Sequence, residues 1–124
     1  MLLNNLYHIV EYAIHEQTLT AQIALQATHP IFEGHFPGQP ILPGVCQTQI
    51  CVELFNALTQ QNLVLTSASV MKFLSFINPN VHQQLTFQLD WINQAGGVVL
   101  NAVISAENVV FLKFKGVLST GYQS

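Results

Sequence analysis

Apolar and polar residues alternate along most of the chain, which is the pattern of β-strands that bury one face. The clearest run lies near position 90, where Leu85, Phe87, Leu89 and Trp91 alternate with Thr86, Gln88 and Asp90. Tyr7–His15 and Leu19–Leu25 are also strand-like, and their closeness in sequence predicts a hairpin. Val98–Ser105 and Val109–Leu118 predict a second pair, and Leu63–Ile77 at least one more strand. The pattern therefore predicts a run of antiparallel strands.

One segment has the period of a helix instead. From Val45 to about Gln61 the apolar residues fall within roughly half of the helical circumference. These are Cys46, Ile50, Cys51, Leu54, Phe55, Ala57 and Leu58, whereas Gln49, Glu53, Asn56 and Gln60 form a polar stripe on the other half. A helix of this length spans roughly 25 Å at about 1.5 Å per residue, enough to be the central element of a small domain. A hairpin, a loop, a long helix and further antiparallel strands make an α+β fold.

Backbone constraint is concentrated directly ahead of this helix, where Gly34 to Gly44 reads G-H-F-P-G-Q-P-I-L-P-G. Proline fixes φ and glycine permits positive φ or close approach, so we expect His35 in a rigid loop that ends at a helix N-terminus. A neutral imidazole titrates near neutral pH and suits a general base. The first amides of a helix have no partner within it, so the N–H of Gly44 can hold an oxygen that develops negative charge. The alternative is a well-made turn whose histidine is incidental.

The string His35-Phe36-Pro37-Gly38-x-Pro40-x-x-Pro43-Gly44 resembles the signature of the beta-hydroxyacyl-acyl carrier protein dehydratases. Members of that family have the hot-dog fold, a long central helix wrapped by a curved antiparallel sheet. The resemblance implies a single hot-dog domain over residues 1–124, with His35 as the catalytic base and the Gly44 N–H as the donor to the enolate oxygen. We expect substrate contacts from Phe36, Pro37, Gly38, Pro43, Val45 and Glu53.

The chain departs from the family at one position. Relatives place a glutamate or aspartate five residues after the glycine of Pro-Gly, as the acid for the departing hydroxide, and the residue here is Gln49. An amide can position a water or a hydroxyl but has no proton to donate at a useful pKa. We assign Gln49 to the catalytic set because it occupies the position of the acid. Glu53, one turn along the same polar stripe, could reach the site instead, and the alternative is an ordinary solvated glutamate.

The composition bears on partners. Only 7% of the 124 residues are charged, and half are hydrophobic, so we expect a homodimer or a higher oligomer in which much of the surface is interface. The net charge is −3, and Lys72, Lys113 and Lys115 are the only cations, which argues against nucleic acid. The resemblance implies an acyl carrier protein or other thioester carrier as partner. With three lysines, its docking is expected to be weak or to depend on apolar contacts.

The remaining features argue against a disulfide, a metal or cofactor site, and a membrane or secretory segment. Cys46 and Cys51 lie about 140° apart around the helix axis, too distant to bridge, and read as buried free thiols of a cytoplasmic protein. The histidines show no metal-ligand spacing, so we expect neither a metal nor a cofactor. No signal peptide or membrane anchor is apparent.

Three functional hypotheses follow. The first is a dehydratase-like protein that converts 3-hydroxyacyl carrier thioesters to trans-2-enoyl thioesters in fatty acid or related polyene or lipid synthesis. The second is a thioesterase, which the same fold supports. The third is a non-catalytic acyl-binding subunit of a complex with a second dehydratase-like chain, which Gln49 and the scarcity of lysine make credible.

Overall fold

The computed structural model describes residues 1–33 and 38–120. The elements in chain order are β1 (Tyr7–His15), β2 (Thr18–Leu25), the 3-10 turn η1 (Pro30–Phe32), α1 (Gly44–Thr59), β3 (Val64–Phe73), β4 (Gln84–Gln94), β5 (Gly97–Ala106) and β6 (Val109–Ser119). The helix and each of the expected strands are confirmed, with boundaries within a few residues of those that the pattern predicts.

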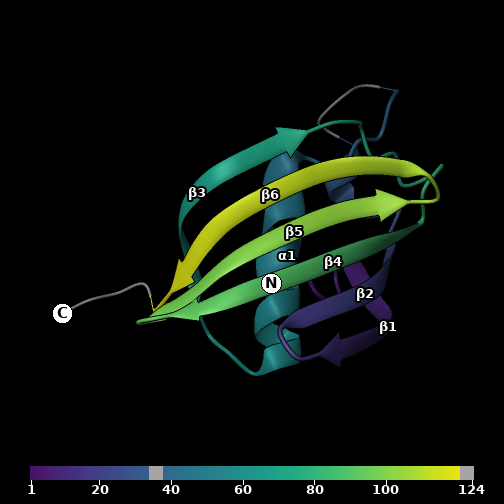
Figure 1. Ribbon diagram of the computed structural model, residues 1–124. Helices are drawn as coiled ribbons and strands as arrows, with labels where there is room; N and C mark the ends of the chain where they lie inside the picture. Colours follow the sequence, from purple (N-terminus) through teal and green to yellow (C-terminus); the bar gives the residue numbers. More distant parts are fainter. Residues whose placement is uncertain (34–37, 121–124) are drawn as a thin grey trace.

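The strands form one antiparallel sheet with the order β1-β2-β4-β5-β6-β3. Figure 1 shows the sheet bending around α1, which runs across its concave side. The chain crosses from β2 through α1 to the far edge strand β3, and then returns through β4, β5 and β6. This arrangement confirms the predicted α+β class and both predicted hairpins.

The alternating residues of the central strands supply the core. Leu85, Phe87, Leu89 and Trp91 of β4 are buried, as the alternation predicts, and the even-numbered residues of β5 from Val98 to Ala106 join them. The helix packs onto this layer, and the ring of Phe55 meets that of Trp91 edge to face with centroids 5.1 Å apart. The sheet therefore holds α1 through apolar contacts, as the helical pattern requires.

Two helix residues depart from the predicted faces. Glu53, expected on the polar stripe, is buried with only 4% of its surface exposed, and Ala57, expected on the apolar face, is exposed. Glu53 is buried because the segment ahead of β1 packs over the helix and supplies hydrogen-bond donors to the carboxylate from Leu2 and Leu3. Ala57 is exposed because it lines a groove beside the start of β3. The interpretation of Glu53 as a solvated glutamate is therefore wrong.

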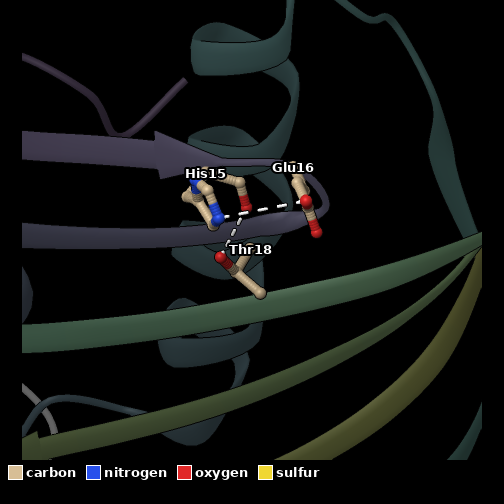
Figure 2. A network of polar contacts seen from close by, with 3 residues as sticks. All are labelled: His15, Glu16 and Thr18. Carbon is tan, nitrogen blue, oxygen red and sulfur yellow. Dashed lines mark hydrogen bonds and ion pairs between the residues drawn. The ribbon is translucent and has the colours of Figure 1, made fainter.

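The turn between β1 and β2 is held by local polar contacts, shown in Figure 2. The Thr18 hydroxyl donates to the His15 carbonyl over 2.7 Å, and Glu16 adopts a positive φ of 54°. The His15 and Glu16 side chains approach to 4.0 Å but are both highly exposed. A pair of this kind contributes little to stability, so the turn depends on the backbone and the threonine.

The edge strand β3 is exposed along nearly its whole length. Its register with β6 directs Leu65, Met71 and Phe73 to the same side of the sheet as the buried residues, yet each remains more than a third exposed. On the opposite side, Lys72 lies across from Lys113, with Lys115 two residues along β6. Within residues 1–33 and 38–120, the strand thus has an unpaired outer edge, one apolar side and one cationic side.

Candidate functional site

The start of α1 presents free backbone donors. Pro43 caps the helix with extended dihedral angles, and its carbonyl accepts from the amides of Cys46 and Gln47 at 3.0 and 3.1 Å. No hydrogen bond of the Gly44 or Val45 amide is found within residues 1–33 and 38–120. These two N–H groups therefore lie at the positive end of the helix dipole, where an oxygen with developing negative charge is stabilised.

The loop ahead of the helix is tied to the body of the protein. The Leu42 amide donates to the Ile77 carbonyl over 2.8 Å, and the Gln47 side chain donates to the Leu42 carbonyl over 3.1 Å. Gln47 is itself buried, and its amide oxygen has no partner in the described part of the chain. These contacts fix the direction in which the helix start points.

Gly44 has no room for a side chain. A Cβ at this position would lie 2.7 Å from the tip of the Phe73 ring, which comes from the end of β3. The ring therefore lies directly against the first turn of the helix and shields one side of the free amides. Phe73 is 48% exposed, so its outer side remains open to solvent or to a partner.

A groove of about 540 Å³ runs along the exposed side of α1 and the start of β3. Its apolar walls are Met1, Val45, Val52, Ala57, Leu63, Val64 and Leu65, and its polar lining is Thr48, Gln49, Glu53, Asn56, Gln61 and Asn62. Asn56 fixes one wall, because its side chain donates to and accepts from the backbone of Leu63 at 2.8 and 3.0 Å. The groove is apolar enough for an acyl chain and has a few convergent polar groups, as ligand sites do.

The carboxylate of Glu53 lies in the inner wall of this groove, and both of its oxygens accept hydrogen bonds. Its Oε1 accepts from the Leu2 amide, the Leu3 amide and the Tyr7 hydroxyl at 3.1, 2.9 and 3.1 Å. Its Oε2 accepts from the Leu2 amide and from Gln49 Nε2, both at 2.9 Å. Every partner is a donor, which is how a buried carboxylate is stabilised away from water.

Gln49 is oriented by that contact. A carboxylate surrounded by donors can only accept, so the amide nitrogen of Gln49 must be the atom that faces Glu53. The Gln49 oxygen lies on the other arm of the same planar group, and no hydrogen bond to it is found among the residues that the structure describes. Gln49 is exposed and lines the groove, so it offers this oxygen as an acceptor.

The two thiols and the tyrosine phenol behind the groove stay protonated. Burial raises the pKa of the Cys51 thiol, and burial together with the Glu53 charge raises the pKa of Cys46 and of the Tyr7 phenol. Both thiols are free and buried, as predicted. A protonated, inaccessible thiol is a poor nucleophile, so neither cysteine is suited to covalent catalysis.

The predicted site residues divide into three groups. His35, Phe36 and Pro37 lie outside the described residues, and Gly38, directly after them, has a positive φ of 79° that glycine alone adopts freely. Pro43 and Gly44 form the helix start, and Val45, 76% exposed, lines the groove together with Gln49. Glu53 lies in the inner wall, with both oxygens already bonded.

Sequence reasoning did not identify Tyr7 and the Leu2 and Leu3 amides as partners of this site. They lie 46 to 51 residues from Glu53 along the chain, and no local pattern connects them. One feature of the sequence could have indicated a buried role for Glu53: it is the sole charged residue of α1, which is unusual for a helix with a solvated side.

A second cavity, of about 490 Å³, lies near η1 and is lined by Asn4, Asn5, Tyr7, His8, Gln26, Thr28, His29 and Pro30. His29 accepts there from the Ile31 amide and so caps the turn. The cavity contains no residue of the Pro-Gly helix start. In residues 1–33 and 38–120, no group of three or more His, Cys, Asp or Glu side chains could hold a metal ion, and no helix is long and apolar enough to cross a membrane.

Comparison with known proteins shows which proteins the chain is similar to. The family model for ApeI-like proteins, described as ApeI dehydratase, matches residues 11–95. A 3-hydroxyacyl-[acyl-carrier-protein] dehydratase FabZ from Zymomonas mobilis is 33% identical over 69 residues, which cover 56% of this chain and 44% of that protein. The chain matches less than half of the length of such curated relatives.

Solved structures share the fold. A chain of the dehydratase heterocomplex ApeI:P from Xenorhabdus doucetiae superposes with a TM-score of 0.73 at 22% identity, covering 90% of this chain and 96% of that one. A hypothetical thioesterase from Streptococcus pneumoniae, solved with coenzyme A, gives a TM-score of 0.65 at 12% identity and covers 98% and 93%. The predicted hot-dog fold is confirmed.

Proposed function

The chain belongs to the ApeI-like dehydratase family, and from this premise we propose that it is one subunit of a dehydratase for 3-hydroxyacyl thioesters held on an acyl carrier protein. The reaction removes a proton from C2 of the acyl chain, breaks the bond between C3 and its hydroxyl oxygen, and releases water and a trans-2-enoyl thioester. It needs a base, donors to the thioester oxygen while the enolate forms, and an acid for the departing hydroxide.

Two of these roles fall to residues of this chain. His35 is the base, as the family motif implies, and the N–H groups of Gly44 and Val45 are the donors to the thioester oxygen. Exposed Val45 lines the groove, and we propose that the thioester end of an acyl chain enters there, next to these two amides. The apolar walls of the groove would then hold the chain.

The third role is the one that this chain lacks, and the Gln49–Glu53 contact is the single observation that carries the proposal. Gln49 has no proton to donate to hydroxide, and Glu53 is committed to donors on both oxygens. The acid must therefore come from another chain.

We propose a mixed assembly for this reason. In relatives, the histidine and the acid of one site come from different chains. A dehydratase-like partner can then supply the carboxylate that works with His35, because Gln49 of this chain provides no acid. The ApeI:P structure is described as a dehydratase heterocomplex, which supports this arrangement.

The edge strand β3 is the proposed interface. Its outer edge pairs with no other strand of the described residues, and its apolar side exposes Leu65, Met71 and Phe73. Strand pairing at such an edge would cover these side chains and bring the partner next to the groove, whose wall includes Val64 and Leu65. We propose that the same contact forms a homodimer when the chain is isolated.

The carrier protein would dock on the cationic side of this region. Lys72, Lys113 and Lys115 gather on adjacent strands, and they are all the cations of the chain. Carrier proteins are acidic, so the three lysines offer a weak electrostatic contact. The two buried free thiols favour a reducing compartment, and we place the reaction in the cytoplasm.

The proposal is tested by turnover of a 3-hydroxyacyl thioester on acyl carrier protein, with the enoyl product and any free acid measured by mass spectrometry. The isolated chain should be slow, and a dehydratase-like chain encoded beside it should restore dehydration on mixing. In the mixture, His35→Ala should lower the rate by about 10²- to 10⁴-fold, the usual effect of losing a general base. Release of free acid instead of enoyl product would favour a thioesterase.

A further inference from the structure

The segment that joins β3 to β4, residues 74–83, exposes large apolar side chains at the end of the molecule where α1 begins. Leu74, Phe76 and Val81 are 53%, 74% and 66% exposed, and they follow directly on the half-exposed Phe73. Figure 1 shows the end of β3 and the start of α1 at the same end of the protein. We call residues 74–83 the β3–β4 loop. Exposed apolar side chains gathered in this way mark an interaction site.

The β3–β4 loop is held in a fixed shape by hydrogen bonds and by a buried anchor. The Leu74 amide donates to the Phe111 carbonyl over 2.8 Å, and the Asn78 carbonyl accepts from the Val81 amide over 3.0 Å. Between these two contacts, Ile77 is fully buried. A surface whose backbone is already ordered loses little conformational freedom when a partner binds, so this loop is suited to docking.

The same loop borders the free amides of the helix start on two sides. A Cβ on Gly44 would lie 2.7 Å from the Phe73 ring, which immediately precedes the loop. The Ile77 carbonyl accepts from the Leu42 amide over 2.8 Å, which ties the loop to the chain just ahead of the helix. A partner seated on the loop would therefore lie next to the N–H groups of Gly44 and Val45.

The charge of this region indicates the kind of partner. Between Glu53 and Asp90, Lys72 is the only charged residue, so the loop contains no carboxylate. An acidic partner with an apolar contact surface would meet apolar side chains and a weak positive field, without repulsion. A second copy of this chain would bring the same lysine and no acid, so the charge favours the acidic partner over self-association.

We propose that the β3–β4 loop is the docking surface for the acyl carrier protein, and that the apolar contacts of Phe76 and Val81 supply most of the affinity. The inference rests on the proposed function, because it takes the substrate to be held on a carrier. The three lysines then act mainly on the rate of encounter, as exposed charges at the rim of an interface do. A carrier docked here presents its thioester to the free amides.

The test compares two ligands that carry the same 3-hydroxyacyl group through an amide link, which prevents hydrolysis. One is joined to acyl carrier protein and the other to free pantetheine, and calorimetry measures the affinity of each for the full chain. Phe76→Ser should weaken binding of the carrier ligand about tenfold and leave that of the pantetheine ligand unchanged, because it removes apolar area that only the carrier covers. Val81→Ser should weaken carrier binding about fivefold for the same reason.

Two control variants separate this surface from other contacts. Ile92→Ser removes an apolar side chain of β4 that is 66% exposed, and it should bind the carrier ligand as wild type does. Lys113→Gln removes one of the cations and should weaken carrier binding by no more than about twofold. Raising the salt concentration from about 0.1 to about 0.5 M should likewise change the wild-type affinity by less than about threefold, since apolar contacts are not screened.

Unchanged carrier binding in Phe76→Ser, or a larger loss in Lys113→Gln, would overturn the inference and leave the proposed function standing. Equal losses for the two ligands in Phe76→Ser would assign this ring to the pantetheine arm and overturn it as well. A lower sedimentation mass of Phe76→Ser would also overturn it, because the loop would then be a contact between subunits. Binding of neither ligand by wild type would instead refute the proposed function.

Discussion

The side-chain nitrogen of Gln49 donates to Glu53 Oε2 over 2.9 Å, one helical turn along α1. The pair joins the exposed wall of the groove to a buried carboxylate that also holds the segment ahead of β1. Glu53 therefore contributes both to the stability of the fold and to the wall of the groove. Gln49 is the exposed residue of the pair and the one that a ligand would contact.

The first prediction concerns the stability that Glu53 provides. Glu53→Ala leaves the Leu2 and Leu3 amides and the Tyr7 hydroxyl without their acceptor, and each unpaired buried donor is unfavourable. We expect a loss of about 3 kcal/mol in the free energy of unfolding by urea. Tyr7→Phe removes one donor and leaves the others bonded, so it should lose about 1 kcal/mol. Equal losses in the two variants would show that the carboxylate is not the centre of the network.

The second prediction concerns Gly44. In wild type, Gly44→Ala brings a methyl group to 2.7 Å from the Phe73 ring, so the ring must move and we expect a loss of about 1 kcal/mol. In a Phe73→Ala background the obstacle is gone, and the better helix propensity of alanine should make the same change stabilising by about 0.5 kcal/mol. A change of sign between the two backgrounds, measured by thermal unfolding, would confirm the contact. The same effect in both would contradict it.

The third prediction is an alkaline loss of stability that involves Cys51. Burial raises the pKa of this thiol in the folded protein, so above about pH 8.5 the unfolded chain ionises it and the folded chain does not. Stability from this group is complete below that pH and falls by about 1.4 kcal/mol per pH unit above it, up to the raised pKa. Urea unfolding at pH 7 and pH 10 should therefore show about 2 kcal/mol less loss in Cys51→Ala than in wild type. If wild type and Cys51→Ala lost the same stability between pH 7 and pH 10, the loss could not be assigned to Cys51.

The fourth prediction concerns the edge strand. We expect sedimentation of the isolated chain to show at least a dimer, and Met71→Asp to shift it toward the monomer mass of 13.7 kDa, because Met71 lies on the apolar side of β3. Val10→Asp, at a similarly exposed position on the opposite edge strand β1, is the matched control. Dissociation by the Val10 change alone would place the interface at β1.

Much of the fold could be predicted from the sequence because the signals are local. The alternation of Leu85, Phe87, Leu89 and Trp91 requires neighbours only two residues apart, and the structure confirms it. The Pro-Gly pair likewise predicts where α1 begins. These features depend on backbone conformation and on which face is buried, and both are recorded in a few consecutive residues.

The burial of Glu53 could not be predicted in the same way. A glutamate on the polar stripe of a helix is normally solvated, and the groups that reverse this are amides about 50 residues away. The exposure of Ala57 has a different tertiary cause, since Ala57 lines a groove that the turn into β3 helps to form. The burial of Glu53 and the exposure of Ala57 both depend on tertiary contacts, and the periodicity of one helix does not predict such contacts.

The measurement that tests the central claim most directly is the turnover of a 3-hydroxyacyl carrier thioester by the isolated wild-type chain and by Gln49→Glu. The new carboxyl group would lie against Glu53, and two carboxyl groups in contact hold a proton between them, which provides the missing acid. We predict slow or undetectable dehydration by wild type and a rate at least about tenfold higher in the variant. Gln60→Glu, at the far end of the same helix, should leave the rate unchanged. Fast dehydration by wild type, or a Gln49→Glu variant no faster than wild type, would contradict the claim that this position lacks only a proton donor.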